Sequence, residues 1–326
     1  MSKGLVDMQS HPKIMSLFHG DNSRGLQDTA SSSDSDSVSD SVKKWNSPWA
    51  KYNIAYIDPK DLVSPSPSPS YSFSASKSKS TASGGIYVFI HSVVGVFKMK
   101  RTEGTWGHGE DILMELLGTL TGNSIIENNN ILGNKNDALI NKVNHVFLSL
   151  LGSDPDVSRC LLTIASSGMN STGKLQLIVA ANNIYLSELP TMYALERFAL
   201  ALGPAKPAAD VTAAKILYIH TKGVRRNGIN AAYPADWRRY MAFFLVEHHS
   251  MCIQAIDEYG FHTCGVLKQR KIYAGNFWWT TAQYIQDRAK SSGYRPLSEL
   301  PWNMDNRYEA EVGKKKRRVI SDNIIA

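Results

Sequence analysis

Short apolar runs alternate with helical patterns along much of this chain, and that alternation limits the fold more than any other feature. The first run, Ile86-Tyr87-Val88-Phe89-Ile90, is β-branched and aromatic, as a buried strand should be. Further short apolar runs lie at residues 146–151, 175–180, 214–219 and 264–267. Strands that alternate with helices predict an α/β domain with a mostly parallel central sheet.

Helical spacing appears between these runs. Residues 110–120 place five apolar side chains on one face, and Pro190 begins a second helix that Gly203 ends. Asp236 is the predicted N-cap of a third, long helix that ends at Gly260. The segment Asp154-Pro155-Asp156 is interpreted as a turn.

The first 83 residues have a different composition. Ser and Asp nearly alternate over residues 31–40, and residues 64–83 are almost wholly Ser, Pro, Lys, Ala and Thr. Such segments bury too little apolar surface to offset their ordering entropy. We therefore expect a disordered leader over residues 1–83, a folded domain over 84–312 and a basic tail over 313–326. An apolar island at residues 45–57 either docks on the domain or is a sticky patch in a linker.

One predicted strand ends abruptly in polar residues. The apolar run Leu217-Tyr218-Ile219 is followed at once by His220, Thr221, Lys222 and Gly223. Ligands of open α/β sheets bind outside the carboxyl ends of the strands, and this group offers hydroxyl, ammonium and backbone N–H donors. Judged alone, these four residues would suggest a surface turn. Together with the motif described next, they predict a site for a phosphate-bearing ligand.

A second motif, Gly275-Asn276-Phe277-Trp278-Trp279, combines aromatic rings with an amide. Aromatic faces stack on sugar rings, and an amide hydrogen-bonds their hydroxyls. We expect Asn276, Trp278 and Trp279 to contact a carbohydrate acceptor. The alternative is core packing, and at least one of the two indoles is expected in the core.

A third motif contains carboxylates and an arginine near residue 310. Glu309 and Glu311 are candidates for a general base, and Arg307 is a candidate for orienting that base or holding phosphate. The alternative is a solvated helix start with i,i+4 pairing.

Metal and disulfide patterns are weak. We find no strong signature for a divalent metal, so no metal ligand is predicted. The three cysteines, Cys160, Cys252 and Cys264, are widely spaced and odd in number, which fits neither a disulfide framework nor a zinc site. We therefore expect a reducing compartment.

The charge is concentrated in one place. The net charge is +7, and the five residues from Lys314 to Arg318 are all basic. The folded domain need not bind nucleic acid, although this run can attract phosphate or act as a nuclear import signal. No apolar stretch is long enough to span a membrane, so a cytoplasmic location is expected.

Several ordered blocks together resemble a family of glycosyltransferase-like proteins related to the rhamnan-synthesis F type, found in polysaccharide clusters and in large viral and microbial genomes. The blocks run from Ile86 to Glu311 and include His220-Thr221-Lys222-Gly223, Gly275-Asn276-Phe277-Trp278-Trp279 and Arg307-Tyr308-Glu309-Ala310-Glu311. The resemblance implies a GT-A-like Rossmann-type α/β/α sandwich and a role in polysaccharide biosynthesis. After Glu311 the chain departs from similar sequences, which tend to continue with an apolar aromatic segment.

The resemblance also implies roles for individual residues of the site. His220, Thr221, Lys222, Gly223 and Arg307 would bind the diphosphate of a nucleotide-diphosphate sugar, which serves as donor. Residues 220–223 stand where GT-A enzymes usually carry an Asp-x-Asp metal motif, so dependence on Mn²⁺ or Mg²⁺ is open, and Lys222 can replace part of the cation's role.

Two functions follow from these patterns. The first is a hexosyl- or deoxyhexosyltransferase that moves a sugar from the nucleotide donor to a glycan or another hydroxyl acceptor, by inversion or retention. The alternative is a noncatalytic, degenerate module that binds carbohydrate or a nucleotide sugar, which the missing Asp-x-Asp pair favours.

Overall fold

The computed structural model describes twelve segments of the 326-residue chain. They are residues 55–56, 84–95, 97–98, 105–106, 109–122, 137–182, 184–202, 213–221, 232–269, 272–273, 275–291 and 297. The predicted domain of residues 84–312 contains all of them except residues 55–56.

The described residues form a seven-stranded mixed sheet in the order β1-β6-β5-β2-β7-β11-β8. Its strands are β1 (Ala55–Tyr56), β2 (Ile86–Val93), β5 (His145–Leu151), β6 (Leu175–Ala181), β7 (Lys215–His220), β8 (Thr263–Gly265) and β11 (Trp278–Thr281). β2 pairs in parallel with β5 and β7, and β5 pairs in parallel with β6. β1 and β11 are antiparallel to their neighbours. The predicted α/β fold with a mostly parallel sheet is confirmed.

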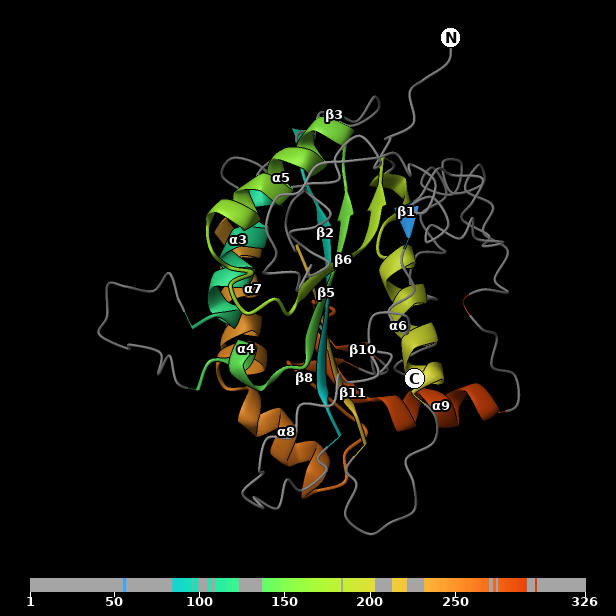
Figure 1. Cartoon of the computed structure of the whole chain (residues 1–326). Coiled ribbons are helices and arrows are strands. Elements are labelled where there is room, and N and C mark those ends of the chain that lie inside the picture. Colours follow the sequence, from blue (N-terminus) through green and yellow to red (C-terminus); the bar gives the residue numbers. More distant parts are fainter. Residues whose placement is uncertain are drawn as a thin grey trace, which may run out of the picture.

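Helices cover both faces of this sheet (Figure 1). They are α3 (Gly109–Leu120), α4 (Leu139–Lys142), α5 (Asp154–Ser166), α6 (Leu189–Ala201), α7 (Ala232–Ala242), the π-helical η7 (Phe243–Glu247), α8 (His249–Asp257) and α9 (Ala282–Lys290). Figure 1 shows α3, α5 and α7 on one face and α6 and α9 on the other. Two hairpins, β3 (Phe97–Lys98) with β4 (Thr105–Trp106) and β9 (Lys268–Gln269) with β10 (Ile272–Tyr273), lie outside the main sheet.

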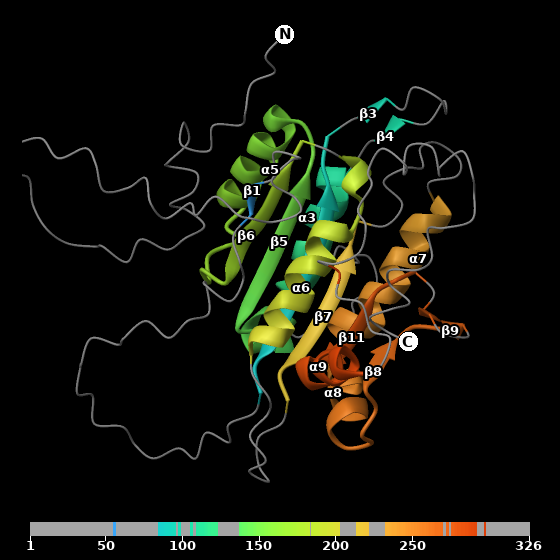
Figure 2. The same ribbon diagram turned by 90° about the vertical axis from the view of Figure 1, so that its right-hand side faces the viewer.

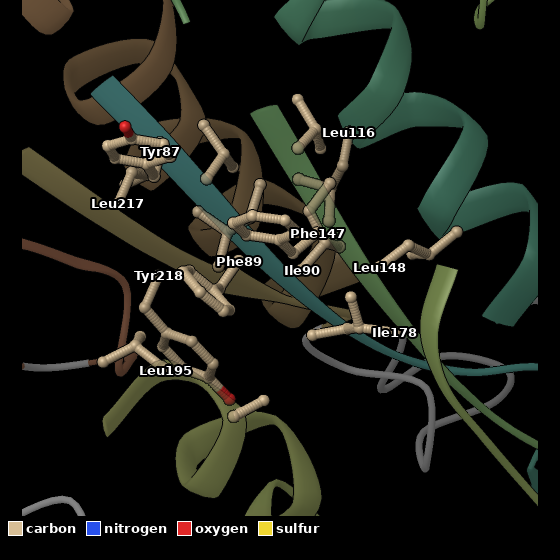
Figure 3. Close-up of a cluster of buried hydrophobic side chains, with 14 of the residues drawn as sticks. Tyr87, Phe89, Ile90, Leu116, Phe147, Leu148, Ile178, Leu195, Leu217 and Tyr218 are labelled. Carbon is tan, nitrogen blue, oxygen red and sulfur yellow. The ribbon is translucent and has the colours of Figure 1, made fainter. Parts of the chain in front are cut away.

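Aromatic rings pack the sheet against α6. Phe89 of β2 lies 4.8 Å from Phe147 of β5, and Phe198 of α6 meets Phe147 edge-on at 5.2 Å between ring centroids. Such pairs add about 0.5–1.5 kcal/mol each beyond their buried area. Figure 3 shows this core, with Leu116 of α3 on the opposite side of the sheet from Leu195 of α6. Both faces of β2 are therefore buried, as its nearly continuous apolar sequence requires.

The helix starts differ from the predicted ones in two places. α5 begins at Asp154, where a turn was expected, because the Ser153 side chain accepts a hydrogen bond from Asp156 N and Pro155 fits the first turn. The long helix already includes Ala232, so Asp236 lies inside α7 and is not its N-cap. The predicted apolar face of residues 110–120 is confirmed by the buried face of α3.

Part of the predicted leader joins the sheet. Ala55 and Tyr56 form β1, which pairs with Ala180 and Val179 of β6. The prediction of a disordered leader is therefore wrong at these two residues, which belong to the apolar island. The rest of residues 1–83 and the tail, residues 313–326, lie outside the described residues.

The cysteine prediction is also wrong. Cys252 of α8 and Cys264 of β8 form a disulfide, with 5.5 Å between their Cα atoms. α8 leads through a short turn into β8, so residues 12 apart in sequence meet. A single bridge between two neighbouring elements needs no framework of spacings, and the cysteines no longer argue for a reducing compartment.

Among the described helices, none has the length and apolar character that spanning a membrane requires.

An ion pair attaches α7 to α3. Arg238 Nη2 donates to Glu115 Oε2 at 2.6 Å, and Arg239 Nε lies 3.5 Å from Glu115 Oε1. Arg238 is buried, so removing the Glu115 carboxylate leaves a buried positive charge without the negative charge that it pairs with.

We expect Glu115→Ala to lower the free energy of unfolding by about 3 kcal/mol, measured by urea denaturation. Asp287→Ala is the control, because it breaks the exposed ion pair with Lys290 and should cost less than about 1 kcal/mol. Equal losses in the two variants would show that the Glu115 pair carries no special weight.

The disulfide predicts the number of reactive thiols. Burial raises the pKa of the Cys160 thiol to about 12, so this free cysteine should react only after denaturation. We expect one thiol per chain in denatured protein without reductant and three after reduction. Reduction should also destabilise the fold by about 3 kcal/mol. Three thiols in unreduced, freshly purified protein would exclude the bridge.

Candidate functional site

The order of the strands reverses direction at β2. The chain passes from β2 outward to β5 and β6, and then returns to the other side of β2 to form β7. In such sheets ligands bind at the carboxyl ends of the strands where this reversal occurs, here between β2 and β7. Figure 2 shows α6, which connects β6 to β7, lying across this part of the sheet.

A polar row replaces the aromatic core at this edge. His91 of β2 is paired in register with His220 of β7 and with Ser149 of β5. Two residues earlier in the strands, the same register pairs Phe89 with Tyr218 and Phe147. Because side chains alternate along a strand, the polar row and the aromatic row lie on the same face, the face that α6 covers.

The start of α6 supplies two more polar groups. His91 Nδ1 and Thr191 Oγ1 are 3.0 Å apart and both side chains are buried. Glu188, just before α6, has a side chain that is 30% exposed and a carboxylate oxygen 3.8 Å from His220 Nδ1. Ser187 precedes it with a φ of 52°, a conformation that costs free energy in a non-glycine residue and clusters at functional sites.

The turn before β11 completes the cluster. Asn276 Nδ2 donates to Glu188 Oε2 at 2.6 Å, and its Oδ1 accepts from Trp278 Nε1 at 3.3 Å. Gly275 O lies 3.1 Å from His220 Nε2. Asn276 has a φ of 61°, so a second non-glycine residue with positive φ contributes to the cluster, and its side chain contacts the residue that follows Ser187.

These contacts constrain the protonation of His220. A carbonyl oxygen only accepts, so Nε2 donates to Gly275 O, while Nδ1 faces the Glu188 carboxylate. This contact places a proton on Nε2 and leaves the 3.8 Å approach of Nδ1 to the carboxylate as an ion pair only when Nδ1 is also protonated. An imidazole that can carry positive charge therefore lies beside a carboxylate that can accept a proton.

Burial has the opposite effect on His91. Desolvation lowers the pKa of His91 to about 4, although the Glu188 carboxylate opposes this shift and His220 adds to it. Burial also raises the pKa of Tyr218 well above its ordinary value, with the negative charge of Glu188 contributing. Both shifts favour the neutral forms of His91 and Tyr218 beside the His220–Glu188 pair.

The structure brings together three of the residues predicted from sequence. His220, Thr221 and Asn276 all lie at this edge. Thr221 Oγ1 accepts from Val93 N at 3.1 Å, so its hydroxyl also ties the end of β7 to β2. Lys222, Gly223, Arg307, Glu309 and Glu311 lie outside the described residues.

The prediction for the two indoles is partly wrong. Trp278 and Trp279 are both 0% exposed, so neither has a ring face available to an acceptor sugar. Adjacent strand residues point to opposite faces, and both faces are covered. Trp278 stacks on Tyr218 at 5.3 Å, while Trp279 Nε1 donates to Leu245 O of η7 at 2.8 Å. The expectation that at least one indole lies in the core is confirmed for both.

Sequence reasoning missed His91 and the roles of Glu188 and Thr191. His91 ends the first apolar run in the same way that His220 ends the fourth, which was a usable signal. Glu188 and Asn276 are 88 residues apart, and nothing local indicates their contact. Within the described segments, no three His, Cys, Asp and Glu side chains are grouped as metal ligands. Comparisons with family models, with curated proteins and with solved structures found no match to this chain.

The lowered pKa of His91 predicts a pH-dependent stability. As the pH falls below about 6.5, His91 binds a proton in the unfolded chain, whereas in the folded protein it stays neutral until about pH 4. Stability is therefore lost across this window, by about 3 kcal/mol from this group.

His91→Gln should remove most of that loss, measured as the difference in unfolding free energy between about pH 7.5 and pH 4. His145 and His249, whose pKa values are also lowered by burial, remain in both proteins and cancel in the comparison. An unchanged pH dependence in His91→Gln would contradict the assignment.

Proposed function

We propose that this protein is a glycosyltransferase that moves a sugar from a nucleotide-diphosphate donor to a hydroxyl acceptor. The observation that carries the proposal is the His220–Glu188–Asn276 cluster at the carboxyl ends of β2 and β7. It combines an imidazole that can carry positive charge and a carboxylate at the point where doubly wound sheets bind nucleotides. The sequence resemblance to glycosyltransferase-like proteins supports the same activity.

On this proposal the donor diphosphate lies against His220 and the end of β7. The His220 ring is held in a fixed orientation because its Nε2–H donates to Gly275 O, so in its doubly protonated form it can stabilise the negative charge of the leaving diphosphate without reorganising. The start of α6 also faces this edge, and the positive end of a helix favours an anion. Lys222, Gly223 and Arg307 stay the sequence-predicted contributors on the donor side.

Glu188 is the carboxylate among the described residues that is best placed to take the acceptor proton. Asn276 fixes one of its oxygens at 2.6 Å, while part of the side chain remains open to solvent. A general base needs both a fixed position and access to the proton it removes. Glu311 and Glu309, outside the described residues, are the competing candidates that the sequence provides.

The alternative function is a noncatalytic module that binds a nucleotide sugar. The observation in its favour is that Glu188 is held by both Asn276 and His220, as a purely structural carboxylate would be. The two functions differ in turnover and not in donor binding.

We expect the full chain to hydrolyse or transfer from at least one member of a panel of nucleotide sugars, assayed with and without Mn²⁺. Glu188→Gln should slow turnover by roughly 100- to 10,000-fold with donor affinity retained, because the amide keeps the shape and cannot accept the proton. Glu258→Gln, at the exposed end of α8, is the matched control and should retain full activity.

Two further variants separate the alternatives. His220→Asn should weaken donor binding by about tenfold, measured by calorimetry, because the imidazole that we place against the diphosphate is lost. If Glu188→Gln is fully active, Glu311→Gln and Glu309→Gln decide the base. Donor binding without turnover under all conditions would establish the noncatalytic module, and failure to bind any nucleotide sugar would refute both functions.

A further inference from the structure

An aromatic groove lies on the exposed side of α7. Tyr233, Asp236, Trp237 and Tyr240 of α7, with Leu267 before β9, line an open depression of about 350 Å³. In a helix, positions three and four residues apart share a face, so these four α7 residues form one continuous stripe. The α7 residues therefore form one wall of the groove, and Leu267, in the turn before β9, adds to its lining.

Trp237 and Tyr240 of this groove pack against other rings, and both groove tyrosines are exposed to solvent. Trp237 and Tyr240 are nearly parallel, with 5.3 Å between ring centroids and an interplanar angle of 22°, and Tyr240 meets Phe244 edge-on at 4.9 Å. Tyr233 is 75% exposed and Tyr240 is 47% exposed. Exposed aromatic rings of this kind offer surfaces on which sugar rings stack.

Gly275 joins the groove to the candidate site. A Cβ atom at Gly275 would lie 2.5 Å from Trp237 Nε1 and 2.2 Å from Met241 Sδ, so only glycine allows the turn to approach α7 this closely. The carbonyl oxygen of the same residue accepts from His220. A ligand that stacks on Trp237 and Tyr240 is thus separated from the His220–Glu188–Asn276 cluster by a single turn of backbone.

The composition of the groove selects a class of ligand. Its lining has one charged residue, the carboxylate of Asp236, beside three aromatic rings and an aliphatic side chain. A carboxylate accepts hydrogen bonds from neighbouring sugar hydroxyls and repels an anionic sugar. The rings meet the apolar C–H face of a pyranose.

We propose that the α7 groove binds a ring of a neutral carbohydrate. The groove takes over the acceptor-binding role that the sequence suggested for Trp278 and Trp279, whose rings are buried. The identification of this carbohydrate as the acceptor rests on the proposed transferase function, whereas the binding itself does not.

The test uses the full chain and trisaccharides of glucose, mannose, galactose and rhamnose, with trigalacturonate as the anionic comparison, titrated by calorimetry and by saturation-transfer NMR. At least one neutral trisaccharide should bind, and more tightly than trigalacturonate. Tyr233→Ala and Tyr240→Ala should each weaken that binding by about three- to tenfold. Tyr259→Ala removes another exposed tyrosine, 66% exposed and outside the groove, and should leave affinity unchanged.

Melting temperatures of the three variants control for folding, and both groove tyrosines are exposed enough that their loss should not unfold the protein. The absence of binding to every neutral trisaccharide, equal losses in Tyr259→Ala, or tighter binding of trigalacturonate would overturn the proposal.

Binding of nucleotide sugars to the same variants separates this proposal from the proposed function. We expect donor affinity to be unchanged in Tyr233→Ala and Tyr240→Ala. Donor turnover without trisaccharide binding at the groove would overturn the carbohydrate-binding proposal for the α7 groove and leave the proposed transferase function in place. Trisaccharide binding that depends on Tyr233 and Tyr240, in a protein that binds no nucleotide sugar, would support the groove and remove the transferase function.

Discussion

Parallel pairing of β2 with both β5 and β7 is the constraint on which the rest of the structure depends. It requires both faces of the sheet to be covered, because parallel strands need long crossover connections. It also sets His91 beside His220 and places the end of β7 next to the end of β2. α6 must then cross the sheet to reach β7, so its first residues arrive at the same edge. The candidate site is a consequence of this topology and not of any one motif.

The polar edge at the ends of β2 and β7 lowers the stability of the fold. His91 and Thr191 are buried polar groups that satisfy one another, and Ser149 Oγ is buried with no hydrogen-bond partner among the described residues. An unpaired buried hydroxyl costs about 1–3 kcal/mol, and each of the two positive-φ turns, at Ser187 and Asn276, adds a similar amount. The aromatic row directly beneath supplies compensating packing. This concentration of unfavourable features in one place is what a functional site produces.

The sequence predicts the local elements well and the long-range arrangement poorly. The apolar runs at 86–90 and 146–151 and the apolar face of α3 reflect burial of one residue after another, which a local pattern records. The insertion of β11 between β7 and β8 depends on non-local pairing, and the pairing that buries both indoles leaves no local signal. The same holds for Glu188 with Asn276 and for the disulfide of Cys252. His220 and Thr221 were predicted correctly at the strand end, because an abrupt change from apolar to polar residues is itself local.

The central claim is that a nucleotide diphosphate binds at the ends of β2 and β7. The most direct test is a histidine-selective ¹³C NMR titration of the full chain with UDP, GDP and dTDP, assigned by single substitutions. The signals of His220 and His91 should move with one saturating curve, while the signal of the exposed His262, before β8, should stay in place. Unchanged His220 and His91 signals at millimolar concentrations of all three nucleotides would contradict the account.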